Sequence, residues 1–424
     1  MKKEEILRQL ETPQWEELVR EELAADPAKE RTRCRELLQK SCELYGDGEY
    51  ALFSAPGRSE IIGNHTDHQH GHVIGASVNI DTIAFAKKNG DGIVRFTSLG
   101  FDLQDVDLSD LSVHEGEKNR TESLIRGIAG ALKERGYAYG GFDGCAVSAV
   151  RAGSGISSSA SFEVLITEIF NHFYNDGKIS AKEVAQISQR AENHWFGKPC
   201  GLLDQMAIAC GGFTFMDFSD PADPQVRSYD FSFADHGYSL VLTASKSDHS
   251  DLSDEYAAMP LEMKEVAAAL GKTFLSECSE EEFYAKLPQL QEELHNDRAL
   301  LRAIHYFGED ARALAAREAI ERGDIDSLLE QMKEGGLSSY RFLQNAFSLK
   351  HPENQIYALT IALSEKLLQG RGITRVHGGG LAGTIQAIVP DEMVEDYCRG
   401  MEAFCGEGSS SVMAIRKAGG IRIL

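Results

Sequence analysis

A glycine- and serine-rich turn constrains the fold of this chain more than any other stretch, because it joins a predicted strand directly to a predicted helix. The strand runs from Gly144 to Val150, where the residues alternate as CAVSAV. The helix begins near residue 157, and its apolar residues recur with the spacing of one helix face as far as Tyr174. The rest of the chain is interpreted around this strand–turn–helix unit.

The turn has the chemistry of an anion site. Gly153 and Gly155 let the backbone fold tightly, and Ser157, Ser158 and Ser159 lie where a helix presents its first unpaired N–H groups. The partial positive charge of a helix N-terminus and three hydroxyl donors favour a nucleotide phosphate, and a hydroxyl also reaches a metal bound to that phosphate. A serine-rich helix cap that binds nothing is the alternative.

Two better-known phosphate loops do not fit the sequence. The glycine- and serine-rich turn lacks the third glycine of a dinucleotide-binding fingerprint. Gly271 to Thr273 spells the end of a Walker A motif, but Val266 stands where that motif requires its first glycine. We therefore interpret the Gly-Lys-Thr segment as the end of a helix.

The composition is that of an ordinary soluble protein. The 424 residues, 42% hydrophobic and 26% charged, suffice for two or three domains with a sizeable core. The net charge of -23 argues against nucleic acid as a partner recruited by electrostatics. No apolar run approaches the ~20 residues that span a bilayer, and the N-terminus lacks the apolar core of a signal peptide, so we expect no membrane partner and a cytoplasmic location. The eight cysteines form no CxxC pair, which indicates reduced thiols.

Helix and strand patterns are mixed along the whole chain, which predicts an α+β fold. Helices are predicted at 1–45, 121–134, 157–174, 181–196, 203–210, over most of 250–370, and at 392–404. Strands are predicted at 49–55, 78–88, 92–99, 144–150, 213–218, 237–244, 384–389 and 413–424. The expected organisation is an N-terminal helical extension at 1–48, a first domain at 49–215 and a second domain at 216–424.

A second concentration of polar residues lies at 55–75, in an expected connection between two strands. Such loops often bind a ligand. Carboxylates, amides and a fixed cation provide the many hydrogen bonds that sugar hydroxyls need, so this loop is a candidate site for a polyhydroxylated ligand. The residues that we expect around it are Arg58, Glu60, Asn64, His65 and Asp67.

The same loop also contains a histidine cluster, for which a metal site is a competing hypothesis. His68, His70 and His72 would share one face if this segment were a strand, and His65 and Asp67 lie close by. A solvated, histidine-rich loop explains the pattern equally well.

Two further segments are candidates for chemistry. Asp204 follows a Pro-Cys-Gly turn and has apolar neighbours, where a carboxylate is costly unless it is paired or acts as an acid or base. Placement in the first turn of a helix is the alternative for Asp204. The segment His377 to Gly383, HGGGLAG, requires a backbone that approaches something closely or takes positive φ, although a tight turn alone would satisfy this.

Together these segments resemble the galactokinases, within the GHMP superfamily of sugar and small-molecule kinases, over most of the chain. Three motifs occur in the family's order: GRSEIIGNHTDH from Gly57 to His68, GSGISSSA from Gly153 to Ala160, and HGGGLAG from His377 to Gly383. The segment 191–205, AENHWFGKPCGLLDQ, resembles the one that carries the catalytic aspartate, and SDEYAAMPLEM at 253–263 resembles the one with a sugar-stacking tyrosine.

The resemblance implies a two-domain GHMP-kinase-like fold with the active site between the domains, and an ATP-dependent sugar 1-kinase acting on galactose. Asp204 would take the proton from the sugar C1 hydroxyl or orient that hydroxyl, and Arg58 would stabilise the aspartate charge. Mg²⁺ would be held by Ser159 and Glu192. The residues implied for ATP are Gly153, Ser154, Gly155, Ile156, Ser157, Ser158 and Ser159, and those implied for the sugar are Asn64, His65, Asp67, Gly201 and Tyr256.

The sequence departs from the family's usual text at three positions, which bears on the identity of the sugar. Glu60 stands where the family has Asn, Asn64 where it has Glu, and His68 where it has Tyr. The segment after Tyr256 also lacks the paired arginines that usually follow. A kinase for a related sugar, a catalytically weak sensor of galactose and ATP, and a metal-binding protein are therefore the alternative functions.

Overall fold

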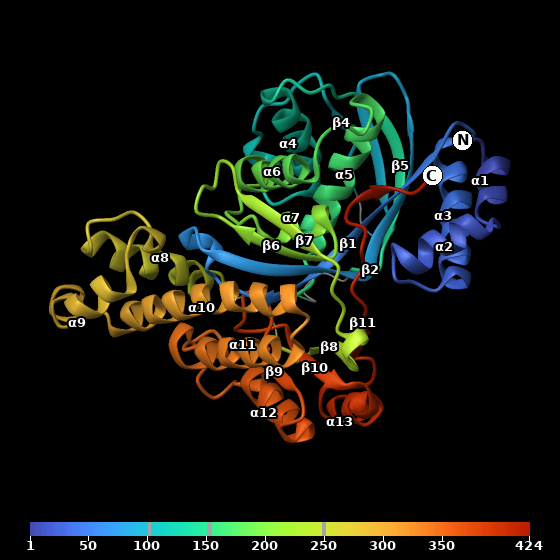
Figure 1. The fold of residues 1–424 in the computed structure, drawn as a ribbon. Coiled ribbons are helices and arrows are strands. Elements are labelled where there is room, and N and C mark those ends of the chain that lie inside the picture. The colour runs from blue at the N-terminus through green and yellow to red at the C-terminus, as the bar shows by residue number, and fades with distance from the viewer. Residues whose placement is uncertain (101–102, 151–154, 248–251) are drawn as a thin grey trace.

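Two β-sheets with helices packed on their faces make up the molecule (Figure 1). The computed structural model describes residues 1–100, 103–150, 155–247 and 252–424. In the larger sheet the strands follow the order β12, β1, β2, β5, β3, β4, and β6 and β7 continue it from β2. The smaller sheet has the order β11, β8, β10, β9. Mixed sheets and helices confirm the predicted α+β class.

The long hairpin of β1 and β2 organises the larger sheet. β2 pairs with β1 along one edge, and with both β5 and β6 along the other. The strands of this sheet are β1 (Ala51–Ile62), β2 (His72–Lys88), β3 (Ile93–Ser98), β4 (Val106–Asp107), β5 (Phe142–Ser148), β6 (Phe213–Asp217), β7 (Gln225–Tyr229) and β12 (Ile421–Arg422).

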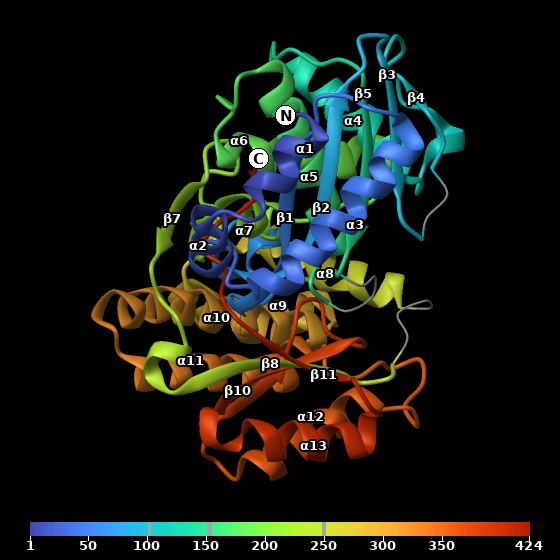
Figure 2. The same cartoon turned by 90° about the vertical axis from the view of Figure 1, so that its right-hand side faces the viewer.

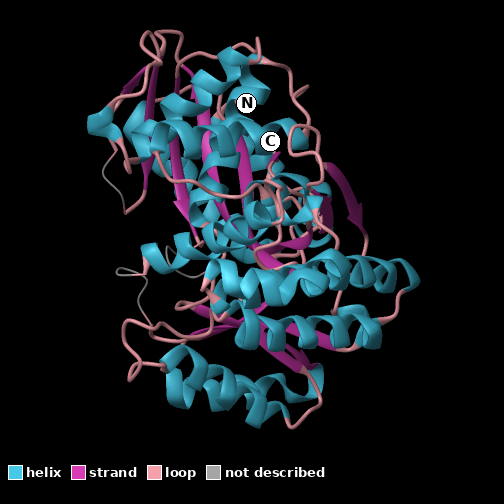
Figure 3. Cartoon of the chain, turned by 90° about the vertical axis from the view of Figure 1, so that its left-hand side faces the viewer, coloured by secondary structure: helices cyan, strands magenta, loops and turns pink. Residues whose placement is uncertain are grey.

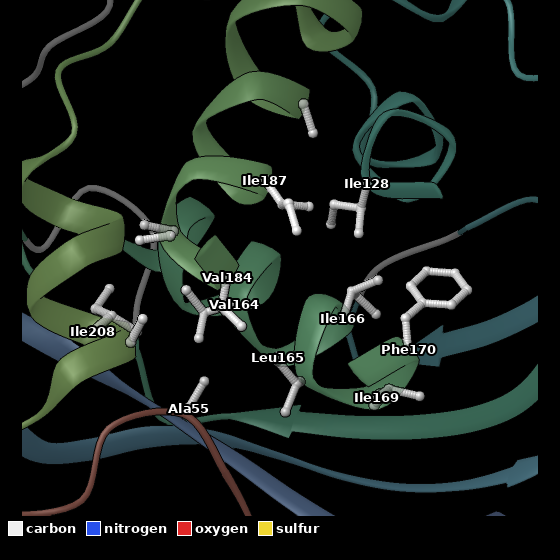
Figure 4. Close-up of a cluster of buried hydrophobic side chains, with 14 of the residues drawn as sticks. Ala55, Ile128, Val164, Leu165, Ile166, Ile169, Phe170, Val184, Ile187 and Ile208 are labelled. Atoms are coloured by element: carbon white, nitrogen blue, oxygen red, sulfur yellow. The ribbon is translucent and has the colours of Figure 1, made fainter. Parts of the chain in front are cut away.

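One face of the larger sheet carries a layer of helices around α5. The layer consists of α4 (Thr121–Glu134), α5 (Ser158–Tyr174), α6 (Ala181–Ala191) and α7 (Leu203–Cys210), with a π-helical turn at Glu192–Phe196. Apolar residues of α5 meet residues of α4, α6, α7 and β1 in one core (Figure 4). Burying each large aliphatic side chain contributes about 1.5–3 kcal/mol, so this core holds α5 firmly against the larger sheet.

The opposite face of the larger sheet is covered by the N-terminal helices, as Figure 2 shows for α1 and α3. The single helix predicted at 1–45 is three: α1 (Lys3–Gln9), α2 (Pro13–Glu21) and α3 (Pro27–Tyr45). The side chains of Thr12 and Asp26 accept N–H bonds and start new helices, each with proline at its first position. Proline in that position loses no helical hydrogen bond, which explains both breaks.

The smaller sheet lies between two pairs of helices (Figure 3). Its strands are β8 (Tyr238–Ala244), β9 (Ile373–Val376), β10 (Thr384–Pro390) and β11 (Ser410–Met413). One of its faces packs on α10 (Asp297–Arg322) and α11 (Ile325–Ser338), and the other on α12 (Ile356–Leu368) and α13 (Val394–Cys405). The helices α8 (Ser253–Ala269) and α9 (Glu280–Leu294) form a separate core with α10. Because α8 ends at Ala269, the Gly-Lys-Thr segment follows a helix end, as predicted.

Three strand predictions need correction. β1 continues past 55 to Ile62, through a register shift between Pro56 and Gly57, so Arg58 and Glu60 lie on a strand and not in a loop. β4, β7 and β9 were not predicted, because each has at most five residues. The closing strand predicted at 413–424 is divided, since Met413 ends β11 in one sheet and β12 joins the edge of the other. Sheet pairing, which no local pattern encodes, decided each case.

The change from one sheet to the other falls between Tyr229 and Tyr238, and the chain returns to the larger sheet at β12. The division into 1–48, 49–215 and 216–424 stays a prediction. Within the described residues, no helix combines the length and the apolarity that crossing a bilayer requires. All eight cysteines are unpaired.

Candidate active site

A clamped aspartate lies at the N-terminus of α5. Asp204, in the first turn of α7, accepts two parallel bonds from Arg58 of β1, with Nε to Oδ1 at 2.7 Å and Nη2 to Oδ2 at 2.8 Å. The Ser157 hydroxyl also donates to Asp204, and Nη1 of Arg58 donates to the carbonyl of Gly155. The guanidinium therefore joins the aspartate to the start of the phosphate turn.

The contacts of Asp204 keep its carboxyl group ionised. Burial acts to raise the pKa of Asp204, but the charge and hydrogen bonds of Arg58 and the hydroxyl of Ser157 outweigh it, so the pKa lies below its usual value. Asp204 is thus ionised at neutral pH. It can accept a hydrogen bond from a ligand hydroxyl, and one-third of its side chain is exposed to receive it.

A cavity of about 240 Å³ opens beside the pair. It brings together side chains from the phosphate turn, from β1 and α7, and from the glycine loop that precedes β10. Its lining consists of Arg58, Gly155, Ser157, Ser158, Ser159, Lys198, Asp204, His377, Gly378, Gly379, Gly380, Ala382 and Thr384. The segments predicted separately to bind phosphate and to approach a ligand closely thus form one site.

Glu192 lies beside this cavity in an acidic cluster. Its Oε2 accepts from Gln205 Nε2 at 2.8 Å and from the Cys200 thiol at 3.0 Å, and its Oε1 accepts from Lys198 Nζ at 3.1 Å. Gln205 also donates to Oε2 of Glu163, whose Oε1 is buried without a hydrogen-bond partner among the described residues. Burial and the nearby charge of Glu192 raise the pKa of Glu163 well above its usual range.

Four of the residues predicted for the sugar lie next to the cavity lining. Gly201 lies against Asp67, because a Cβ on this glycine would be 1.8 Å from the Asp67 Oδ2 atom. His65 Nε2 lies 3.3 Å from the carbonyl oxygen of Gly379, and burial lowers the pKa of His65 to about 3, so the ring is neutral. The ring of Tyr256 packs on the same glycine, with Cε1 2.6 Å from where its Cβ would be.

Asn64 is placed differently, in a fully buried polar network. Its Nδ2 donates to Glu60 at 3.0 Å and to the carbonyl of Gly378 at 2.7 Å, and its Oδ1 accepts from Asn345 at 2.8 Å. Arg375 Nη2 lies 3.1 Å from Oε1 of Glu60. Glu60 and Asn64 therefore pair at the end of β1, and Asn64 joins this pair to the glycine loop.

The predicted common face of three histidines is wrong. Asp67–Gln69 forms a short 3-10 turn and His70 has a left-handed backbone, so only His72 lies on β2. The ring of His70 stacks on Phe274, and His72 Nδ1 lies 2.9 Å from Asp310. Among the residues that the structure describes, no group of three or more His, Cys, Asp or Glu side chains is arranged to hold a metal ion.

Of the predicted phosphate-binding residues, Gly155 to Ser159 border the N-terminus of α5. Gly155 and Ser157 both have positive φ, which turns the chain sharply into the helix. Gly153 and Ser154 lie outside the described residues. Ile156 is buried against the core shared with the smaller sheet, so its contribution to the turn comes from its backbone.

Comparison with known proteins decides the family. The galactokinase galactose-binding signature matches residues 42–88, and the GHMP kinases N terminal domain matches residues 123–212. A galactokinase of Streptomyces coelicolor is 30% identical over 368 residues, covering 86% of this chain and 92% of the relative. The chain belongs to the galactokinase family. A galactokinase of Actinobacillus pleuropneumoniae serotype 3 is also 30% identical, over 85% of this chain and 91% of the relative.

Solved structures confirm the galactokinase-like fold. The crystal structure of Lactococcus lactis galactokinase complexed with galactose has a TM-score of 0.79, with 24% identity over 92% of this chain and 100% of that chain. A mevalonate kinase has a TM-score of 0.59, with 12% identity over 86% of this chain and 98% of that chain. The fold is therefore that of the GHMP kinases.

The two family matches cover the two sides of the galactokinase-like site. Arg58, His65 and Asp67 fall within the galactose-binding signature, whereas the serines of α5, Glu192 and Asp204 fall within the GHMP domain. The smaller sheet's glycine loop completes the cavity from outside both matched ranges.

The sequence did not lead us to assign a role to Lys198 and His377, which line the cavity, or to Glu163, which lies near Glu192. Lys198 stands midway between Glu192 and Asp204, so its spacing from two candidate residues was a usable signal. His377 was noticed only as the start of the glycine loop; its Nε2 lies 3.0 Å from the Ser59 hydroxyl, and its Nδ1 faces Gly155. Glu163 lies among apolar residues of α5, where the cost of a buried carboxylate was the available signal.

Proposed function

We propose that this member of the galactokinase family transfers the γ-phosphoryl group of ATP to the C1 hydroxyl of galactose. The observation that carries the proposal is the Arg58-clamped Asp204 at the N-terminus of α5, in a cavity shared with the phosphate turn. Helix N-termini bind phosphate through unpaired N–H groups. An ionised carboxylate within the same cavity lies where it can hold the acceptor hydroxyl.

In the proposed reaction Asp204 orients the hydroxyl and receives its proton as the new oxygen–phosphorus bond forms. The bond from the γ-phosphorus to the bridging oxygen breaks, and ADP leaves with the electron pair. Such transfers depend mainly on alignment and on neutralising charge. The lowered pKa of Asp204 makes it a weak base, so alignment is its larger contribution.

We propose Ser159 and Glu192 as the residues that hold Mg²⁺ with the ATP phosphates. Mg²⁺ prefers hard oxygen donors and is usually held by one or two carboxylates together with substrate phosphates. Glu192 fits, since among the described residues its Oε1 accepts a bond only from the side chain of Lys198, and Ser159 lines the adjoining cavity. When bound, the ion would neutralise charge on the phosphates.

For the sugar we propose His65, Asp67, Gly201 and Tyr256. His65 and Tyr256 contact Gly379 of the glycine loop, and Asp67 contacts Gly201, which precedes α7. The side-chain amide of Asn64 already forms hydrogen bonds with Glu60, Gly378 and Asn345. We therefore propose that Asn64 contributes to sugar binding by holding the glycine loop in position.

The test is an ADP-release assay over a panel of sugars, with Asp204→Asn as the variant. We expect galactose to be phosphorylated by the native protein, and the amide variant to lose about 10²–10⁴-fold in turnover, because the amide neither carries the charge that aligns the hydroxyl nor accepts its proton. ATP affinity should change little, because the amide nearly preserves the shape. Asp217→Asn, with a similarly exposed aspartate on β6, is the control. Near-normal turnover in Asp204→Asn would contradict the assigned role, and preference for another sugar would redefine the substrate.

A further inference from the structure

Lys198 is the cavity residue to which neither the fold nor the proposed mechanism gives a role. It lies in the loop between the π-helical turn and α7, and it lines the same cavity as Arg58, Asp204 and Ser159. Its side chain is 58% exposed and lines the cavity, so a ligand there can approach it. A lysine kept solely for packing would have no reason to face this cavity.

Each nitrogen of the other cation in the cavity, Arg58, already donates to a protein group. Two of these nitrogens donate to Asp204 and one to the carbonyl of Gly155. Lys198 has three N–H donors, and among the described residues Glu192 is its hydrogen-bond partner. Lys198 therefore retains donors for an incoming anion.

The described part of the phosphate turn, residues 155–160, contains no lysine or arginine, so this part contributes N–H groups, hydroxyls and the helix dipole. The triphosphate of ATP brings several negative charges toward Asp204 and Glu192. A mobile ammonium group between these two carboxylates would offset that repulsion.

We propose that Lys198 is a further catalytic residue, which contacts the γ-phosphoryl group of ATP and neutralises the charge on its oxygens during transfer. The proposal rests on the proposed function, because it assumes that ATP phosphates occupy the cavity. Glu192 holds the ammonium group in place before the nucleotide binds. The long, flexible side chain of Lys198 would allow the ammonium to turn toward the phosphate if Glu192 held Mg²⁺.

The competing role for Lys198 is that of a counter-ion to Glu192 alone. In that case, removing its charge would leave Glu192 freer to bind Mg²⁺ and would not distinguish ATP from ADP. Contact with the γ-phosphoryl group predicts the opposite pattern, since only ATP carries that group.

The experiment is calorimetric titration of the full chain with the magnesium complexes of ADP and of a non-hydrolysable ATP analogue with a β,γ-imido bridge. We expect Lys198→Met to weaken binding of the analogue by about 10-fold or more, the size of one lost charged hydrogen bond, and to leave ADP binding unchanged. Lys198→Arg should retain most of the affinity, because it keeps the charge. Lys182→Met, which removes a lysine paired with Asp223 away from the cavity, is the control.

Equal changes for both nucleotides, or no change together with a lower Mg²⁺ requirement, would overturn the proposal. Turnover supplies a second readout: loss of one group that stabilises transition-state charge costs about 10²–10³-fold in kcat. If the native protein phosphorylated no sugar, the proposed function would fail, yet the difference between ADP and the ATP analogue would still test Lys198. Lys198→Gln serves as a second variant if the methionine variant does not fold.

Discussion

At the scale of single residues, the pair of Arg58 and Asp204 combines a structural role with a chemical one. Asp204 is partly buried, and a carboxylate that loses part of its water stays ionised when a partner compensates for that loss. Here the compensation is a two-bond guanidinium contact between residues 146 positions apart. The same contact that keeps Asp204 charged also fixes its direction toward the cavity.

This pairing predicts how stability responds to pH when Arg58 is replaced by Met. The native pKa of Asp204 lies below its unfolded value, so the pair stabilises the fold above about pH 4 and loses this contribution as the pH falls further. Without Arg58, burial would raise that pKa above the unfolded value. Arg58→Met should then cost about 1–3 kcal/mol at pH 7, and less at pH 5, where Asp204 begins to take up a proton.

Urea unfolding of both proteins at pH 7 and pH 5 measures this difference. Arg227→Met, at an exposed ion pair with Glu321, should change stability by less than about 0.5 kcal/mol at either pH. A loss in Arg58→Met that is the same at both pH values would show that Asp204 is not the responsible group.

At the scale of elements, the start of α7 positions two functions at once. Gly201 precedes the helix and lets Asp67 approach its backbone, and Asp204 follows within the first turn. The glycine is required for space, because its φ is not in the left-handed region. Any side chain at 201 would displace the Asp67 carboxylate.

We therefore predict that Gly201→Ala raises the KM for galactose about 10-fold or more, the effect of losing one polar contact, with little change in the KM for ATP. Gly116→Ala is the matched control, since a Cβ there meets nothing within 4 Å. Steady-state kinetics with each substrate varied in turn supply the measurement. An unchanged galactose KM would remove Asp67 from the sugar site.

The end of β1 leads to a prediction about the exchanged residues Glu60 and Asn64. Burial raises the pKa of Glu60 to about 7, and the amide of Asn64 and the guanidinium of Arg375 are its partners. Asn64→Glu alone would place two buried carboxylates together and should destabilise the fold. The double exchange, Glu60→Asn with Asn64→Glu, should recover part of the loss.

A double-mutant cycle on unfolding free energy tests this coupling, which for contacting residues is typically about 0.5–3 kcal/mol. The same cycle on the KM for galactose shows whether the exchange also tightens sugar binding. Additive effects on stability would contradict the coupled pair.

At the scale of the whole molecule, one cluster of charged residues links an N-terminal helix and a C-terminal segment to the larger sheet. Asp81 of β2 pairs with Arg33 of α3 at 2.5 Å and with Arg416, which follows β11, at 2.9 Å. Ser54 of β1 also donates to this carboxylate. The N-terminal helices and the returning C-terminal segment therefore share one anchor.

Asp81→Asn should reduce stability by about 3–5 kcal/mol at pH 7, because it removes the ion-pair partner of the buried Arg416, whereas Arg33 keeps its ion pair with Glu30. Burial opposes ionisation of Asp81, but the two arginines hold its pKa below the usual value. The difference between variant and native protein should therefore shrink only when the pH falls below about 4. Urea unfolding measures it, with exposed Asp176→Asn as control; a loss no larger than that of the control would contradict the shared anchor.

The sequence by itself determined the local elements and the family. Helix α7 at 203–210, helix α4 at 121–134 and the helix after the serine turn follow from periodicity and from turn residues, which act between near neighbours. The ordered motifs likewise lie in short segments. They indicated phosphate, sugar and aspartate positions without any knowledge of how the segments meet.

Only the tertiary structure decided which residues share the cavity. It paired Arg58 with Asp204 and brought the glycine loop next to the phosphate turn. It also placed Lys198 in the cavity lining and directed the Asn64 side chain into a buried polar network. It also divided the closing strand between two sheets and separated the three histidines. These outcomes depend on sheet register and on helices packing across the core, that is, on contacts between residues far apart in sequence, whereas periodicity and capping act over a few residues.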